Sequence, residues 1–392
     1  MIRTRQILAL ALFTATPVLH ADVVTEWNQI MLQTFAAEAS SAAPPINSRT
    51  MGMLGGAVFD AVNSVNRNYQ SYLGYFDPTT AGVGVDMEAA AATAAYNTLT
   101  SIYTDRYGAG NPYLSNFTNL YNNQMSSIAA GDSKTRGTEV GAAAAAAMVG
   151  ARASDGWNAA PTYSPQPFGT VGRWQPGTNP GAWGANSGTF LYSQWNNVTP
   201  FALTSASQFR PGGPAGLNGT TPADYQAWVQ SSAYTAEFNQ IKSLGSSTSS
   251  TRTADQTVIA YFWVDGPGTA SPPGHWNRIA QSISASAGLN LEQNARLFAL
   301  LNLAEADTGI ATWEAKVYFD NVAGDTLQAV IRNLALGARI VLCGMIEAYS
   351  MDTPPPGPWL GPVVGAAFCL VAGVFLAVAP ARVVHGTTAR QP

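Results

Sequence analysis

The segment Leu291–Phe319 carries apolar side chains on almost every side of a helix, and no other feature constrains the fold as strongly. Its apolar positions include Ala295, Leu297, Phe298, Leu300, Leu301 and Leu303. A helix that is apolar all round has to be covered on every side. We therefore expect a central helix that is surrounded by other helices.

Six further segments show the apolar spacing or the alanine-rich composition of packed helices. They are Thr25–Ala37, Arg49–Val65, Met87–Tyr103, Thr138–Ala153, Asp224–Leu244 and Ala254–Val264. Thr253 is a predicted N-cap for the last of them. The chain up to about residue 317 is therefore predicted to be mainly α, a helical bundle.

A long stretch without clear periodicity, Trp157–Pro222, interrupts these helices and is rich in Gly, Pro, Asn, Thr and Trp. Connections of this length usually wrap around a scaffold and often carry function. We expect its large aromatic side chains to pack against the helices; these are Trp174, Trp183, Trp195, Phe201 and Phe209.

The charge content argues against a nucleic-acid partner. Charged residues make up 11% of the chain and the net charge is −4, so no basic stripe is available for a phosphate backbone. The two cysteines, Cys343 and Cys369, lie in apolar runs and are expected to be buried small residues.

The first 21 residues have the three parts of a secretory signal peptide. Arg3 and Arg5 give the positive start, Ile7–Leu19 is mostly apolar, and Ala21 is a small residue before a cleavage site. A buried first helix is the alternative. We expect a secreted or periplasmic chain that begins near Asp22.

The tail, residues 359–392, contains a second apolar run. Val363–Pro380 is uncharged over eighteen residues and is followed by Arg382, which reaches the lower limit for a membrane span. The run is either a membrane anchor or a stretch translated from the wrong reading frame that happens to be apolar. The sequence leaves both alternatives open.

Several pieces between residues 21 and 316 together resemble the bacterial vanadium-dependent haloperoxidases, which share their fold with type 2 phosphatidic acid phosphatases. The pieces include SRTMGMLGGAVFDAVNSV, VGRWQP, WNNVTPFALTSASQFRPGGP, YFWVDGPGTASPPGHWNRIA and LNLAEADTGIATWEAK. The resemblance implies a helical bundle that binds vanadate and uses hydrogen peroxide to oxidise halide. It also implies a cage of cationic and donor side chains around the oxyanion, supplied by Lys-x6-Arg-Pro, Pro-Ser-Gly-His and Ser-Arg-x5-His.

Lys316 is the one cage residue that the resemblance assigns here. The positions where the family has Arg-Pro are Ala323 and Gly324, and neither later motif follows. His385 is the last histidine, and no Ser-Arg precedes it. Because one lysine cannot offset the desolvation of an oxyanion, we expect an impaired or inactive haloperoxidase domain over residues 22–316.

Other polar residues are expected to be structural. His275 follows Pro-Pro-Gly and should lie near a helix start, in a structural or channel role. Asp60 should pair with Arg49 or with another buried polar group. Glu305 and Asp307 are two residues apart, so they should face different sides of their helix.

From about residue 317 to 358 the chain resembles a second family, the zinc-independent, NADP-dependent reductases of the medium-chain group. The resemblance implies a short βαβ-like fragment with a strand at Val317–Asn321, a helix at Gly324–Leu334 and a strand at Arg339–Cys343. The glycine-rich turn that would hold the pyrophosphate is missing upstream, so NADP binding is not expected.

Four functions follow from these observations. A vanadium haloperoxidase-like protein with most of its cage missing agrees best with the residues. A non-enzymatic exported helical module, a phosphatase of the same fold and, least favoured, an NADP-dependent oxidoreductase are the alternatives. The two resemblances meet near residues 316–322. The sequence leaves open whether this junction is biological, a frame shift or an assembly error.

Overall fold

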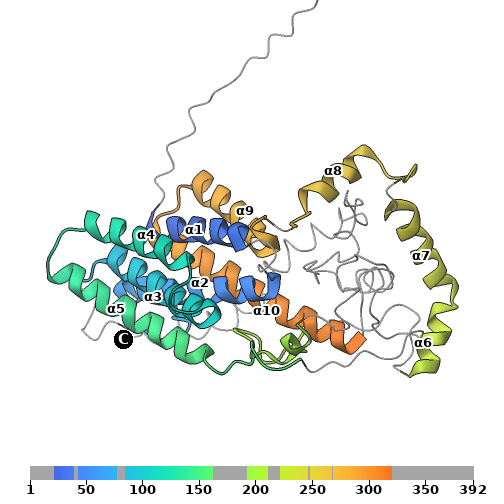
Figure 1. The fold of residues 1–392 in the computed structure, drawn as a ribbon, viewed down its shortest axis with the longest axis horizontal. Coiled ribbons are helices and arrows are strands. Elements are labelled where there is room, and N and C mark those ends of the chain that lie inside the picture. Colours follow the sequence, from blue (N-terminus) through green and yellow to red (C-terminus); the bar gives the residue numbers. More distant parts are fainter. Residues whose placement is uncertain are drawn as a thin grey trace, which may run out of the picture.

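The computed structural model describes residues 22–38, 43–76, 84–161, 192–210, 221–245, 248–266 and 268–319. Over these ranges it consists of helices, turns and irregular segments, without a strand (Figure 1). The helices are α1 (Val23–Glu38), α2 (Pro44–Asn66), α3 (Met87–Tyr107), α4 (Tyr113–Ser127), α5 (Asp132–Arg152), the 3-10 helix η2 (Ser193–Asn197), α6 (Pro222–Val229), α7 (Ser232–Gly245), α8 (Ala254–Phe262), α9 (Ser271–Ala287) and α10 (Leu291–Phe319). The predicted mainly helical fold is confirmed.

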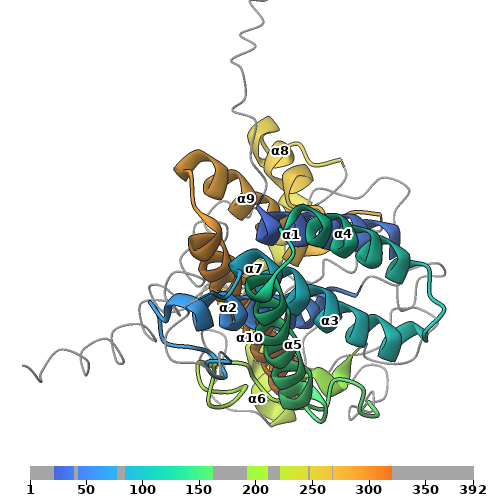
Figure 2. The same cartoon turned by 90° about the vertical axis from the view of Figure 1, so that its left-hand side faces the viewer.

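The predicted central helix is α10, with the bounds that the sequence indicated. It packs along α2 and also contacts α1, α9 and η2. Glycines in α2 allow the two backbones to approach closely, because a Cβ on Gly55 would lie 3.0 Å from the carbonyl oxygen of Phe298. In both views α1 and α4 lie next to each other over one side of the bundle (Figures 1 and 2).

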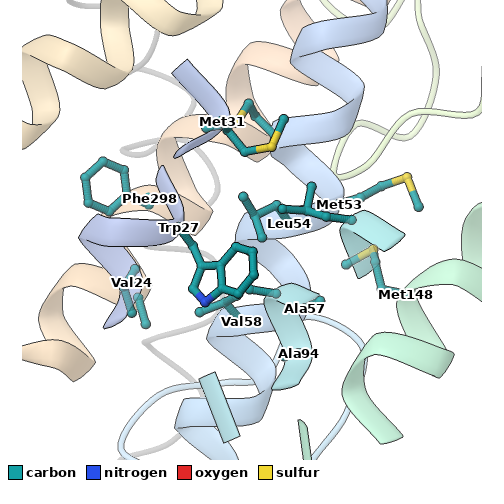
Figure 3. Packing of buried hydrophobic residues seen from close by; sticks show 14 of the residues in the cluster. Val24, Trp27, Met31, Met53, Leu54, Ala57, Val58, Ala94, Met148 and Phe298 are labelled. Carbon is teal, nitrogen blue, oxygen red and sulfur yellow. The ribbon is translucent and has the colours of Figure 1, made fainter. Parts of the chain in front are cut away.

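The core joins side chains from both ends of the sequence. Figure 3 shows Trp27 and Met31 of α1 beside Leu54 and Val58 of α2, with Phe298 of α10 close by. All five are buried. Each such side chain contributes roughly 1.5–3 kcal/mol relative to an exposed position, so this core fixes α1, α2 and α10 as one unit.

The helices differ from the sequence expectation in three places. Helix α4 was not predicted, and α9 was predicted only as a helix start near His275, without bounds. The single helix expected over residues 224–244 is two helices. Helix α6 ends at Val229 with Gln230 as its C-cap, and Ser231 Oγ then accepts a hydrogen bond from the backbone N–H of Tyr234 at 3.1 Å. The Ser231 side chain therefore acts as the N-cap of α7. Thr253 caps α8 as expected.

The irregular stretch packs against the bundle only in part. Trp195 and Phe201 are buried, as expected. Phe209 is 54% exposed, so the expectation that it packs down is wrong. Trp174 and Trp183 lie outside the described residues.

Most predictions for the two ends of the chain also fall outside the described residues. These are the signal peptide at 1–21, nearly all of the βαβ-like fragment at 317–358, and the tail at 359–392 with its apolar run. Residues 317–319 are described and continue α10, so the strand predicted from Val317 is wrong over those three positions. Of the helices that are described, none has the length and apolarity needed to cross a membrane.

Candidate functional site

The C-terminal half of α10 is tied to the segment that follows η2 through one carboxylate. Asp307 Oδ2 accepts hydrogen bonds from the backbone N–H groups of Ala202 at 2.7 Å and Leu203 at 2.9 Å, and Oδ1 accepts from Phe201. Burial raises the pKa of this carboxyl, while the three N–H donors lower it. The interaction fixes where the 201–203 segment lies on the central helix.

A buried group of charges lies at the other end of the same segment. Asp155 Oδ2 accepts from Arg49 Nε at 2.8 Å and from Arg152 Nε at 2.9 Å. Arg152 also donates to the carbonyl oxygens of Thr199 and Pro200. Buried ion pairs require this degree of hydrogen bonding to offset desolvation. The cluster therefore joins α2 and α5 to the segment that Asp307 holds.

Lys316, the predicted oxyanion ligand, lies in the last turns of α10, and its side chain is outside the described residues. Two residues earlier, Glu314 forms an ion pair with Arg210, with Arg210 Nε 2.9 Å from Glu314 Oε2.

Glu305 lies about three turns before Lys316 in α10 and is buried. Its Oε2 accepts from Asn277 Nδ2 at 3.2 Å, while Oε1 has no hydrogen-bond partner. Asn277 Oδ1 in turn accepts from Asn28 at 2.6 Å and from Asn302 at 3.1 Å. Burial raises the pKa of Glu305 well above its ordinary value of 4.5, and only the Asn277 hydrogen bond opposes this. The carboxyl joins a network of amide side chains between α1, α9 and α10.

Glu305 and Asp307 therefore have different partners on different elements, as their spacing predicted. They do not form a carboxylate pair. Asp60 is also structural. Its carboxylate accepts from the backbone N–H groups of Tyr72 at 2.6 Å and Leu73 at 2.7 Å. The predicted alternative of an Asp60–Arg49 pair is wrong, because Arg49 bonds Asp155.

His275 lies in the first turns of α9, as the sequence indicated. Its Nδ1 is 3.1 Å from Asp265 Oδ2, and its ring stacks on Trp263 with the centroids 4.9 Å apart. Phe262 meets the same ring edge-on at 4.7 Å. These contacts fix the imidazole between α8 and α9, consistent with the structural role.

Sequence reasoning missed the partners of Arg49, Asp155 and Asp307. Each of these contacts joins residues about a hundred positions apart. The available signal was a charged side chain inside an otherwise apolar helix, as at Arg49 and Asp307. Such a side chain indicates a buried partner without saying which one.

The arrangement of these elements is the helical fold of the vanadium haloperoxidases. A bacterial vanadium-dependent iodoperoxidase matches with a TM-score of 0.61 at 18% identity, over 76% of this chain and 69% of that one. The apo form of a bacterial vanadium-dependent chloroperoxidase matches with a TM-score of 0.50 at 15% identity, over 78% of this chain and 70% of that one. At these identities the similarity establishes the fold.

Comparison with curated sequences gives short matches of another kind, among them the following two. (+)-Pulegone reductase of Mentha piperita is 50% identical over 38 residues. A zinc-type alcohol dehydrogenase-like protein of Schizosaccharomyces pombe is 45% identical over 38 residues. In each match the chain spans only 11% of the relative's length. No family model matches the chain.

The described residues do not fit a complete vanadate cage. Vanadate carries several charges and needs several cations and donors to replace its water. At the C-terminal end of α10 the neighbouring cation, Arg210, is bound by Glu314. Across the described ranges, no group of three His, Cys, Asp or Glu side chains could hold a metal ion. The motifs that would complete the cage do not follow Lys316 in the sequence.

We expect the free energy of unfolding of Glu305→Gln to increase relative to that of wild type as the pH rises. The raised pKa means that the carboxyl keeps its proton to higher pH in the folded state than in the unfolded state, where it ionises near pH 4.5. Its contribution to stability is therefore fully present below pH 4.5 and is lost as the pH rises toward the folded pKa. Glutamine keeps the shape and does not ionise. The free energy of unfolding of the variant should gain on wild type by up to about 1.4 kcal/mol per pH unit in this window.

Urea titrations at several pH values measure this difference. Glu88→Gln, at an exposed position in the first turn of α3, is the matched control and should show no comparable trend. A difference between Glu305→Gln and wild type that stays constant from pH 4 to 8 would contradict a protonated Glu305.

Proposed function

We propose that this chain is a vanadium haloperoxidase-like protein whose own oxyanion site is incomplete, so that it has little or no halide-oxidising activity by itself. The observation that carries the proposal is the end of α10. Lys316 belongs to the last turns of this helix, where Glu314 forms an ion pair with Arg210. The fold supports the family, and the missing cage residues support the impairment. Vanadate, hydrogen peroxide and halide are the proposed ancestral cofactor and substrates.

The free energy that one lysine can contribute predicts weak anion binding. One charge-assisted hydrogen bond contributes about 1.5–3 kcal/mol. A millimolar dissociation constant corresponds to about 4 kcal/mol. A site that depends on Lys316 alone should therefore bind vanadate or phosphate more weakly than about millimolar. Both anions are tetrahedral and would make the same contact, so a phosphatase of the same fold remains the related alternative.

We expect the purified chain to show no vanadate-dependent oxidation of iodide or bromide by hydrogen peroxide. Any residual binding of orthovanadate should be lost in Lys316→Met, which removes the charge and keeps the length of the side chain. Lys316→Arg, which keeps the charge, is the matched control. Halide oxidation followed by absorbance, with vanadate binding followed by vanadium NMR, measures both quantities.

Vanadate-dependent turnover comparable to that of a complete haloperoxidase would contradict the proposed impairment. Vanadate binding that is equal in wild type and Lys316→Met would show that Lys316 does not bind the anion. Absence of both turnover and anion binding would favour the non-enzymatic exported helical module.

We further propose that the chain is exported and begins at Asp22 after cleavage of residues 1–21. Asp22 Oδ1 accepts from the backbone N–H of Thr25 at 2.9 Å, and Oδ2 accepts from Asn294 Nδ2 at 2.8 Å. Asp22 thus caps α1 and ties it to α10, so a chain cut before Asp22 keeps both interactions.

The N-terminal sequence of the exported protein should therefore start with Asp-Val-Val-Thr. Recovery of the chain from the cytoplasm with Met1 intact would contradict export.

A further inference from the structure

Two carboxylates of α10 hold the two ends of the segment formed by residues 201–210, which we call the strap. Asp307 accepts from the backbone N–H groups at the start of the strap, and Glu314 forms an ion pair with Arg210 at its end. Asp307 and Glu314 are seven positions apart, which is about two turns and nearly the same side of the helix. The strap therefore follows one side of α10.

The first end of the strap is buried and bonded to several elements. Asp307 is 2% exposed and accepts from three consecutive N–H groups. The carbonyl oxygen of Phe201 accepts from the hydroxyl group of Tyr72 at 2.7 Å. Arg152 donates to the two carbonyl oxygens just before the strap. Because opening this end would break these hydrogen bonds together, we expect it to stay closed.

The second end of the strap is closed by an ion pair that solvent reaches. The side chains of Arg210 and Glu314 are 28% and 12% exposed. Those of the Arg49–Asp155 pair in the core are 8% and 0% exposed. Ion pairs that solvent reaches contribute little to stability and are weakened by salt. Residues 207–209 are exposed, so opening this end uncovers little additional apolar surface.

We propose that the strap opens at its Arg210 end while its Asp307 end stays closed, and that ionic strength controls this opening. Salt weakens the attraction between the guanidinium of Arg210 and the carboxylate of Glu314, whereas buried interactions such as those of Asp307 are screened much less. The end that opens lies against the last turns of α10. The strap does not depend on the proposed function, because its contacts do not involve a bound anion.

The exchange of the Arg210 Nε–H with water, followed by 15N NMR, tests the strap directly. Arg210→Lys identifies the resonance. Arg49 is the internal reference, because its Nε–H donates to Asp155 in the core at 2.8 Å. From about 0.01 M to about 1 M sodium chloride, exchange at Arg210 should accelerate by roughly two- to fivefold relative to Arg49. An equal salt dependence at the two arginines would overturn the proposed control by ionic strength.

A charge-removing variant tests whether the two ends open separately. Glu314→Gln keeps an acceptor but removes the charge, so exchange at Arg210 should be fast already at low salt and nearly independent of salt. The backbone amides of residues 201–203 should keep their exchange rates. Glu292→Gln, which removes a carboxylate from the first turn of the same helix, is the matched control and should change neither. Acceleration at residues 201–203 equal to that at Arg210 would overturn the strap, because the segment would then open as one piece.

Sodium chloride and sodium phosphate at the same ionic strength distinguish screening from anion binding. We expect the two salts to accelerate exchange at Arg210 equally. A larger, saturable effect of phosphate would overturn screening as the cause. The salt series uses the wild-type chain, so it remains a test if Glu314→Gln does not fold. These measurements contain neither vanadate nor peroxide, so their outcome is independent of the halide-oxidation assay.

Discussion

The position of the segment that follows η2 depends on the carboxylate of Asp307. This carboxylate is buried in the central helix and accepts from three consecutive backbone N–H groups at residues 201–203. The segment that it holds also accepts from Arg152, which in turn bonds Asp155 together with Arg49. Through these contacts one side chain of α10 positions η2 and connects the helix to the charged core of α2 and α5.

Much of the fold could be predicted because helical periodicity is local. The bounds of α10 follow from a run of apolar residues that no exposed helix would tolerate. Helix α4 was missed because Tyr113–Ser127 is rich in Asn and Ser, which disfavour helix interiors, and the core holds it through residues such as Phe117. The break between α6 and α7 depends on the cap at Ser231, which a continuous helical pattern conceals.

The candidate site was less predictable, because its contacts are long-range. Resemblance gave Lys316, and the structure places that residue within α10 without testing its role. The same helix continues to Phe319, so the residues that resemble the reductases begin within α10. Helical pattern and strand pattern both fit Val317–Phe319 in isolation, and packing on the bundle selects the helix. The partners of Asp307 came only from the three-dimensional arrangement.

Hydrogen exchange at the amides of residues 201–203 tests the dependence on Asp307 most directly. Asp307→Asn removes the charge and one acceptor, and lost charge-assisted bonds contribute about 1.5–3 kcal/mol. Exchange at Phe201, Ala202 and Leu203 should therefore accelerate by about tenfold or more, with the amides of α3 unchanged. Unchanged protection at these three amides, or an equal loss throughout the bundle, would contradict the role assigned to Asp307.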